Sequence, residues 1–384
     1  MNYMRKLYMI LALTIVVAAL IAFLTFERSQ ETTTQSTTEY TSPTNTLSQG
    51  YIEVVDALNR TVKLVKYPER IVAIGPGALR LIAYLNALDL LAGVEEVELT
   101  WSTLGRDYAM AYGDYLKKLP VIGPGGPGNT PDPEKIRSIK PDLVVMSSIY
   151  AQLYDPDRLS SEANAPVIVV DYGSAGYVNI SEVEKTLLLL GRALNKEERA
   201  VELTRYIDSI VGDLANRTRS ITSKPRVYVG AVSYKGAQPF TSSQVYFPPL
   251  VLLNTPSIVD GLSSKTGFVS VDFEYILSVQ PEYVFLDLNN LNIVLDDFKK
   301  DPAKYCALNA FREHRVYSIL PFNYYHTNIA TALADAYFIG KVLYPSEFSD
   351  VDPVYKANEI FRVFLGRELY ELFTKGYGFG FSEL

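Results

Sequence analysis

Short apolar runs alternate with helix-like segments along most of this 384-residue chain, from about residue 51 onward. Apolar runs typical of strands cover residues 70–75, 91–95, 120–123, 143–146 and 166–172, and helical patterns cover residues 78–87 and 134–140. A chain that alternates strands with helices favours a parallel sheet, because each parallel strand needs a crossover connection. The alternation resumes after Lys224 and Pro225, so the sequence predicts an α/β fold with mainly parallel sheets.

A long segment between the two alternating regions, residues 179–223, breaks this rhythm. Ser181 and Glu184 have the spacing of a capping box at a helix start. Beyond a break near Asn195, residues 196–221 contain no proline and one glycine, and their apolar residues keep a rough helical period. At 1.5 Å per residue such a helix would run for about 40 Å. We therefore expect a stiff helix that joins two separate bodies.

The two alternating regions share a repeated segment. Residues 134–145 read EKIRSIKPDLVV and residues 274–285 read EYILSVQPEYVF. Four pairs coincide at an offset of 140 positions: Glu134 with Glu274, Ile136 with Ile276, Ser138 with Ser278, and Pro141 with Pro281. A shared spacing of this kind indicates two copies of one structural unit. The alternative is that the helix-proline-strand pattern recurs by chance, as it does in many α/β proteins.

The first 50 residues differ in character from the rest. Arg5 and Lys6 precede an uncharged apolar run at residues 8–26, which is long enough to span a hydrocarbon core of about 30 Å. Positive charge before the run predicts an N-terminus inside the cell. Residues 1–26 are therefore expected to be a membrane anchor, or a signal segment that is cleaved, and the Ser/Thr-rich residues 27–50 a stalk. The rest of the chain would lie on the outer face of the cytoplasmic membrane, or be secreted after cleavage.

The remainder divides into an N-terminal lobe of residues 51–178, the linker helix region of residues 179–223 and a C-terminal lobe of residues 224–384. The net charge of −7 makes nucleic acid a poor partner, because phosphate binding needs a basic face. One cysteine excludes an internal disulfide, and two histidines with one cysteine exclude a zinc-finger site. No Gly-x-Ser-x-Gly elbow occurs, and we predict no catalytic residue. An extracellular enzyme or a surface structural protein is the alternative from another class.

One connecting segment, FNYYHTN at residues 322–328, concentrates aromatic and amide side chains. It lies between a strand-like run at residues 315–320 and a helical run that begins near Ile329. The polar residues that we expect to fix this turn and cap the helix are Asn323, Thr327 and Asn328.

The three rings of this segment, Tyr324, Tyr325 and His326, have several possible roles. They could stack on a large flat ligand or hydrogen-bond to its oxygens, because tyrosine combines a stiff apolar face with a polar tip. They could instead coordinate ferric iron directly, or serve the structure alone. The sequence leaves these alternatives open.

Together these motifs resemble the class III (cluster A-II) substrate-binding proteins of ABC importers, the family that carries ferric siderophores, haem and cobalamin. The similarity covers about residues 51–384 and is nearest to archaeal iron-complex binding proteins. The segments that carry it are residues 55–62, Pro68-Glu69-Arg70-Ile71-Val72, Gly75-Pro76-Gly77-Ala78, the two repeated segments, the long linker, Phe240-Thr241-Ser242 and the loop that holds Tyr324. Gln238 and Pro239 depart from the pattern of many archaeal relatives, which leaves the exact ligand open.

The resemblance implies two Rossmann-like lobes joined by one long rigid helix, with a ligand cleft between the lobes. It implies a protein that captures a chelated metal, first of all a ferric siderophore-type complex, and delivers it to an ABC permease dimer. A cobalamin or other corrinoid, or haem, is the alternative cargo. No cofactor is expected, and the metal would be held within the ligand rather than directly by the protein.

The cleft of such a protein is built from loops at the carboxyl ends of the strands, where open α/β sheets bind ligands. Gly75-Pro76-Gly77 before a helix leaves backbone N–H groups free for anionic oxygens. Arg80 would add charge there or pair on the surface, and the glycines of residues 123–128 would let a bulky ligand approach the backbone or form a plain loop. The expected ligand-binding residues are Pro76, Gly77, Arg80, Gly125, Gly126, Tyr172, Lys235, Ser242, Tyr246, Tyr324, Tyr325, His326 and Asn328.

The repeated segments also carry a pair of acids with an implied partner. In the family, one glutamate on the outer surface of each lobe docks into the permease dimer, and the matching residues are Glu134 and Glu274. The alternative role of both is to stabilise the N-terminus of a helix through its dipole.

Overall fold

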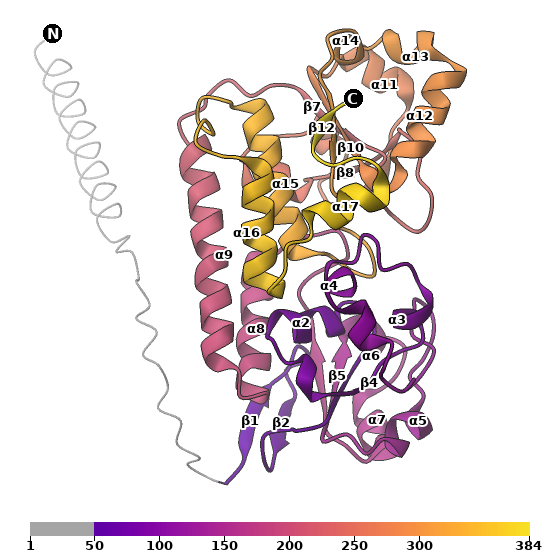
Figure 1. Ribbon diagram of the computed structural model, residues 1–384, viewed down its shortest axis with the longest axis vertical. Helices are drawn as coiled ribbons and strands as arrows, with labels where there is room; N and C mark the ends of the chain where they lie inside the picture. Colours follow the sequence, from indigo (N-terminus) through magenta and orange to yellow (C-terminus); the bar gives the residue numbers. More distant parts are fainter. Residues whose placement is uncertain (1–49) are drawn as a thin grey trace, which may run out of the picture. The chain divides into compact units, whose positions relative to one another are not determined.

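The computed structural model describes residues 50–384, which form one compact unit with two α/β lobes (Figure 1). The predicted anchor of residues 1–26 and nearly all of the predicted stalk, residues 27–49, lie outside the described residues. No helix within residues 50–384 combines the length and the apolar character that a membrane crossing requires.

Lobe 1 is built on a parallel sheet whose strand order is β4-β3-β5-β6. Its strands are β3 Ile71–Ile74, β4 Leu91–Gly93, β5 Leu143–Ser147 and β6 Val167–Val170, with the antiparallel hairpin β1 Ile52–Val55 and β2 Thr61–Leu64 beside them. Its helices are α2 Ala78–Tyr84, α3 Val97–Thr100, α4 Asp107–Leu116, α5 Pro133–Ser138, α6 Ser148–Ala151 and α7 Pro156–Ala163. The strand predicted at residues 120–123 is reduced to a single bridge between Val94 and Val121.

Lobe 2 repeats this plan with a sheet of order β12-β11-β10-β7, in which only the short edge strand β12 is antiparallel. Its strands are β7 Val227–Gly230, β10 Tyr283–Asp287, β11 Val316–Ile319 and β12 Ser382–Glu383, with the separate antiparallel pair β8 Ser242–Val245 and β9 Gly267–Ser270. Its outer helices are α10 Pro248–Leu252, α11 Phe273–Val279, α12 Leu291–Lys300, α13 Pro302–Cys306 and α14 Asn309–Arg312. Two separate, mainly parallel sheets confirm the predicted fold class.

The repeated segments form the same structure in both lobes. Helix α5 leads to β5, and α11 leads to β10; Ile136 and Ile276, at matching positions, are fully buried. The N–H of Asp142 donates to the carbonyl of Arg70 (2.6 Å), and that of Glu282 donates to the carbonyl of Arg226 (2.8 Å). Matching hydrogen bonds, whose donors are 140 positions apart, support the interpretation of the two lobes as copies of one structural unit.

The segment between the lobes contains two helices, α8 Ile180–Ala193 and α9 Glu197–Thr218, with Asn195 in a left-handed turn between them. Helix α8 lies along α9 and packs on β1, so α9 is the one of these two helices that runs from one lobe to the other. Its 22 residues span about 33 Å. The predicted capping box is wrong, because the side chain of Asn179, not Ser181, accepts the N–H of Glu182 and caps α8.

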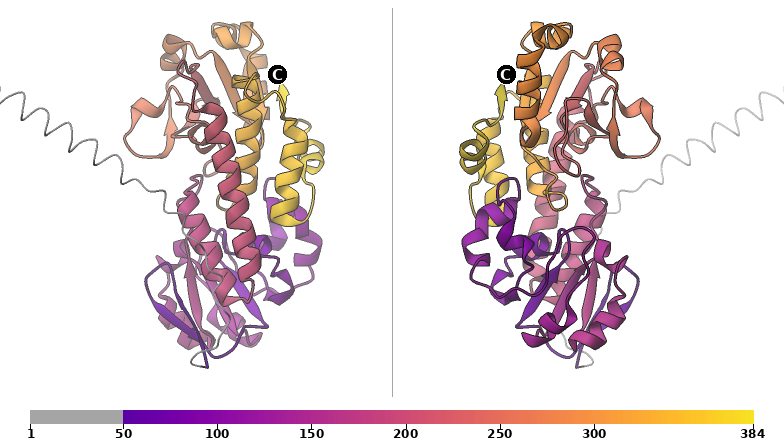
Figure 2. Two further views of the ribbon diagram at one scale, coloured as in Figure 1. Left: turned by 90° about the vertical axis from the view of Figure 1, so that its left-hand side faces the viewer. Right: turned by 90° about the vertical axis from the view of Figure 1, so that its right-hand side faces the viewer.

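Helix α9 is not the only connection between the lobes, since the last part of the chain returns to lobe 1. It forms α15 Ile329–Leu343, α16 Pro353–Leu365 and α17 Tyr370–Tyr377. Helix α16 lies beside α9 (Figures 1 and 2), where the Tyr206 hydroxyl donates to Glu359 (2.8 Å). The ring of Phe364 on α16 meets the ring of Tyr84 on α2 of lobe 1, with centroids 4.9 Å apart.

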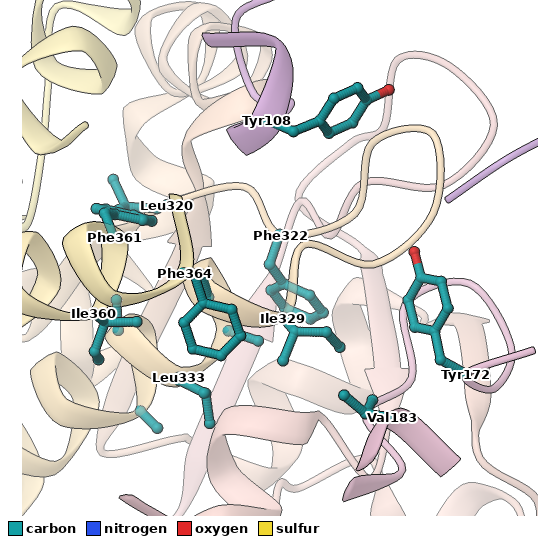
Figure 3. Close-up of a cluster of buried hydrophobic side chains, with 14 of the residues drawn as sticks. Tyr108, Tyr172, Val183, Leu320, Phe322, Ile329, Leu333, Ile360, Phe361 and Phe364 are labelled. Carbon is teal, nitrogen blue, oxygen red and sulfur yellow. The ribbon is translucent and has the colours of Figure 1, made fainter. Parts of the chain in front are cut away.

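One hydrophobic core continues from lobe 1 into lobe 2 beneath these helices (Figure 3). Tyr172 from lobe 1 and Val183 from α8 belong to the same buried cluster as Phe322 and Leu333 from lobe 2. Helix α15 is buried on all sides except at Lys341 and Val342, as expected of a helix that is apolar around its whole circumference. The lobes are therefore held together by a shared interior as well as by α9.

Candidate ligand-binding site

The loops at the carboxyl ends of the two sheets face each other and are hydrogen-bonded across a boundary that we call the inter-lobe seam. From lobe 1 the seam includes the loops after β3, β4 and β6, and from lobe 2 it includes residues 322–328, which follow β11. Residues 322–328 therefore lie where the sequence analysis placed them, between the lobes. Most of their side chains are buried there, whereas Asn323 and Tyr324 are partly exposed.

Arg80 is the main link across the seam. Its side chain is fully buried, and its Nε donates to Asp107 (2.9 Å) within lobe 1. The rest of its guanidinium reaches lobe 2, where it donates to the carbonyls of Tyr324 (3.0 Å) and Tyr325 (3.3 Å) and to Oδ1 of Asn328 (2.6 Å). With a further bond to the hydroxyl of Tyr172 (3.0 Å), five hydrogen bonds match the five donors of a guanidinium. Arg80 is thus an interior residue that holds the loop of lobe 2.

Glu95, in the loop after β4, forms a second link. Its Oε2 accepts the backbone N–H of Gly75 (2.9 Å) and the hydroxyl of Tyr325 from lobe 2 (2.9 Å). The same hydroxyl accepts the N–H of Gly126 (3.0 Å). Burial raises the pKa of Glu95 to about 7, against the effect of these hydrogen bonds. The N–H of Gly75, which the sequence suggested for an anionic ligand, is thus occupied by a carboxylate of the protein itself.

His326 stabilises the shape of the same loop. Its Nδ1 accepts the N–H of Thr327 (2.9 Å), and its ring lies 4.2 Å from the ring of Tyr172. Burial lowers the pKa of His326 to about 3, so that the ring is neutral. The hydroxyl of Thr327 accepts the N–H of Gly176 (2.8 Å), which adds another contact between the lobes.

The backbone of this loop is strained. Tyr325 and His326 have φ angles of 51° and 81°, in the left-handed region that side chains disfavour. Asn328 occupies the cap position of α15, but its side chain makes no capping hydrogen bond. It accepts from Arg80 and donates to the carbonyl of Gly105 (2.8 Å) instead, so the predicted helix cap serves the seam.

Aromatic side chains lie at the partly exposed part of the seam. Trp101 of lobe 1 stacks on Tyr324 with ring centroids 6.2 Å apart, and it meets Tyr325 edge-on at 5.3 Å. The guanidinium of Arg106 lies 5.7 Å from the Tyr324 ring and donates to Glu98 (2.7 Å). The stacked rings offer a flat, polarisable surface to a ligand. The cation beside them, Arg106, is already neutralised by Glu98.

The structure brings most of the predicted ligand-binding residues together at the seam. Pro76 and Gly77 lie in the loop that packs on Tyr172, and Gly125 and Gly126 adjoin Glu95 and Tyr325. The members of this group are Pro76, Gly77, Arg80, Gly125, Gly126, Tyr172, Tyr324, Tyr325, His326 and Asn328. Their role in ligand binding stays a prediction.

The three other predicted residues, all in lobe 2, do not contact the loop of residues 322–328 through their side chains in the interactions described above. The hydroxyl of Ser242 donates to the carbonyl of Val232 inside lobe 2 (3.0 Å). Tyr246 is 39% exposed in the loop after β8. Lys235 is exposed, and its ammonium lies 5.0 Å from the ring of Tyr234.

The sequence analysis did not identify the buried charges of lobe 1. Asp107 pairs with Arg80, and Glu98 pairs with Arg106, and all four side chains are almost fully buried. Glu95 belongs to the same region. No local signal in the sequence marks these charges as buried, because each ion pair joins residues that are several positions apart. Among residues 50–384, no three His, Cys, Asp or Glu side chains lie together in a way that could hold a metal ion.

Glu134 and Glu274 occupy equivalent exposed positions, each in the first turn of its helix. Glu134 also lines a surface hollow of about 680 Å³, together with Arg137, Tyr154 and Arg158. Both carboxylates are therefore accessible to a partner.

Comparison with known proteins relates this geometry to a family. The family model described as periplasmic binding protein matches residues 71–321, which include α9 and both four-stranded sheets apart from the edge strand β12. The chain is 23% identical over 276 residues to YvrC of Bacillus subtilis, an uncharacterised ABC transporter substrate-binding lipoprotein; the match covers 70% of this chain and 78% of that protein. It is 24% identical over 215 residues to the Fe(3+)-citrate-binding protein YfmC of the same organism, with 53% of this chain and 62% of that protein covered.

A solved structure shows the same fold. The TroA-like periplasmic binding protein FepB from Veillonella parvula superposes with a TM-score of 0.65 at 21% sequence identity. The superposition covers 83% of this chain and 97% of the other.

Proposed function

This chain belongs to the periplasmic binding protein family, and we propose that it captures a ferric chelate outside the cytoplasmic membrane and delivers it to an ABC permease. The family and the fold are those of binding proteins of ABC transporters rather than of enzymes. Membership of this family agrees with the resemblance found in the sequence. A relative named for Fe(3+)-citrate binding supports an iron complex as the cargo.

The observation that carries the proposal is the meeting of two sheet edges at one seam. Open α/β sheets bind ligands at the carboxyl ends of their strands, and here both sheets direct those ends toward residues 322–328. The two strained residues of that loop, Tyr325 and His326, are consistent with a functional site, since such strain persists where the surroundings enforce it. The cargo would bind at this seam, with its metal held by the chelate.

Titration calorimetry of the full chain in detergent tests the cargo. The panel contains a ferric trihydroxamate, a ferric tris-catecholate, ferric citrate, haem and cobalamin. The proposal expects one of the ferric chelates to bind with micromolar or tighter affinity and to be recovered unchanged. Preferential binding of cobalamin or haem would show that the cargo is one of the alternatives implied by the resemblance and not a ferric chelate. Chemical conversion of the chelate would instead indicate an enzyme.

We further propose that Glu134 and Glu274 dock on a permease dimer. The two carboxylates lie at equivalent positions of two similar lobes, which suits a partner with two equivalent binding sites. Exposed charges of this kind act mainly on the association rate and on the register of the complex. The double variant Glu134→Lys, Glu274→Lys should bind cargo normally but fail to support uptake into vesicles that contain the permease. The double variant Glu53→Lys, Glu69→Lys, at acids outside the repeated segments, is the matched control. Undiminished uptake by the first variant would exclude docking.

A further inference from the structure

We propose that Tyr234, Lys235, Gln244 and Phe268 form a cargo subsite that selects a ferric chelate of low net charge with a planar conjugated group. This inference rests on the function proposed above and narrows its substrate. The subsite lies on lobe 2 against the loop of Gly176 from lobe 1.

The aromatic part of the subsite is a stacked pair. The rings of Tyr234 and Phe268 lie 4.1 Å apart with an interplanar angle of 18°. Tyr234 keeps 38% of its surface exposed, although water solvates the apolar ring of a tyrosine poorly. Phe268 lies against Gly176, where a Cβ atom would come within 2.5 Å of its ring. The pair is thus fixed on the side of lobe 1 and accessible on the side of Tyr234.

Gln244 adds a hydrogen-bond acceptor that the fold does not use. Its Nε2 donates to the carbonyl of Gly176 (2.6 Å), which fixes the orientation of the amide. Its Oε1 has no hydrogen-bond partner, although the residue is only 1% exposed. A buried acceptor without a partner costs free energy, and a donor that reaches it restores that loss. A chelate with an amide N–H or a hydroxyl could supply this donor.

The charges at the seam limit the charge of the cargo. Arg80 is paired with Asp107, and Arg106 is paired with Glu98, so neither guanidinium offers net charge to a ligand. Glu95 adds a buried acid. Lys235 is the one cation of the proposed subsite; among the described residues it has a contact with the Tyr234 ring but no salt bridge. One exposed ammonium balances about one negative charge, far from the several that a tris-catecholate of iron carries.

The backbone of Lys235 supports a role for its side chain. Its φ of 49° lies in the left-handed region, next to Gly236 with a φ of 97°. Glycine would adopt this conformation at lower cost than lysine. A lysine kept in this conformation directs its side chain over Tyr234 at the seam, at the cost of some strain.

Competitive calorimetry on the full chain in detergent tests the subsite, with a neutral ferric trihydroxamate and a trianionic ferric tris-catecholate as probes. The wild type should bind the trihydroxamate at least tenfold more tightly. Tyr234→Leu, which keeps apolar bulk but loses the flat ring, and Phe268→Leu should each weaken this binding by about five- to tenfold. Tyr355→Leu replaces a tyrosine exposed on α16 and should change nothing.

The outcomes separate the subsite from the proposed function. If the trihydroxamate binds and the Leu variants bind it as the wild type does, the subsite is wrong while the function stands. Tighter binding of the tris-catecholate would likewise overturn the charge selection alone. If the wild type binds no ferric chelate of the panel, the proposed function fails and the subsite with it. Melting temperatures within about 3 °C of the wild type show that the variants are folded.

Discussion

The two lobes share a framework but differ in the loops that face each other at the seam. In lobe 1, glycine takes the left-handed positions at this edge, whereas in lobe 2 residues with side chains take several of them. The lobe 1 residues are Gly75, Gly77, Gly125, Gly126, Gly173 and Gly176, and those of lobe 2 include Ala231, Lys235, Tyr325 and His326. Each side chain held in this region costs about 1–3 kcal/mol. Lobe 2 therefore carries the strain that places rings and an ammonium at the seam.

Charge is distributed in the opposite way. Lobe 1 supplies buried ions to the seam, namely Arg80, Glu95, Glu98, Arg106 and Asp107. Lobe 2 supplies uncharged hydrogen-bond acceptors to Arg80, namely the carbonyls of Tyr324 and Tyr325 and the side-chain amide oxygen of Asn328. Two lobes with the same framework thus present one edge rich in ions and glycine and another rich in neutral rings and amides. The comparison teaches that the same framework of sheet and helices can carry either kind of edge. The hydrogen bonds of the inter-lobe seam, however, require one edge of each kind.

The largest expected effect comes from removing the ion that joins the two edges. Arg80→Ala leaves Asp107 buried without its cation and removes the Arg80 donor from four further acceptors. Loss of one partner of a buried ion pair costs about 3–5 kcal/mol, so urea unfolding should show a decrease of this size. Arg158→Ala removes an exposed arginine of lobe 1 and should stay within about 0.5 kcal/mol of the wild type. Equal stability of the two variants would mean that Arg80 does not hold the loop of lobe 2.

The next largest effect concerns the acid of the same edge. The pKa of Glu95 is about 7 in the folded protein, above the ordinary value of 4.5. The folded state therefore keeps a proton that the unfolded state loses, and stability present below pH 4.5 is lost as the pH rises to 7. At 1.36 kcal/mol per unit, this loss amounts to at most about 3 kcal/mol.

Glu95→Gln removes this titration. The variant should have a flatter profile of unfolding free energy between pH 5 and pH 8 than the wild type, as measured by urea denaturation. Glu96→Gln, at the exposed neighbouring acid, should reproduce the wild-type profile. Burial also raises the pKa values of Glu98, Asp287 and Asp335. These three acids are present in the wild type and in both variants, so their titration does not affect the comparison. Parallel profiles for wild type and Glu95→Gln would contradict a buried proton on Glu95.

A smaller effect separates two reasons why a position requires glycine: the close approach of a neighbouring side chain, and a strained backbone conformation. Gly176→Ala places a Cβ within 2.5 Å of the Phe268 ring in a residue with a φ of 78°, and it should cost about 2 kcal/mol. Gly236→Ala has a φ of 97° but open space around it, so strain alone should cost about 1 kcal/mol. Thermal unfolding of both variants measures the difference. A larger loss in Gly236→Ala would show that the lobes are not in close contact at Gly176.

The smallest effect tests whether the shared framework is equivalent in the two lobes. Arg70 donates to the carbonyl of Ile139 (2.9 Å), and Arg226 donates to the carbonyl of Gln280 (3.1 Å), both at the surface. Arg70→Ala and Arg226→Ala should each cost about 0.5–1 kcal/mol. Chemical denaturation should find the two losses equal within error. A clear inequality would show that the resemblance of the two lobes does not extend to their energetics.

The sequence predicted the framework better than the seam. Strands such as β3, β5 and β6 followed from short apolar runs, and α9 from a helical period without proline, because these signals are local. The predicted strand at residues 120–123 and the Ser181 cap were wrong, since a single bridge and the side chain of Asn179 take their places.

The site could be predicted only in part for a physical reason. Strand ends indicated which loops meet, and the ring-rich segment of residues 322–328 was conspicuous. The contacts that define the seam, however, join residues such as Arg80 and Tyr325 that are 245 positions apart. A buried ion pair looks like surface charge until both partners are placed, so Glu98 and Arg106 gave no local sign of burial.

The continuous core beneath the seam has a consequence for how this chain unfolds. Phe364, near the end of the chain, completes the interior of the first lobe, and α15 contributes buried side chains to a cluster shared by both. The two lobes should therefore melt in a single cooperative transition, and neither half could be produced as an autonomous domain.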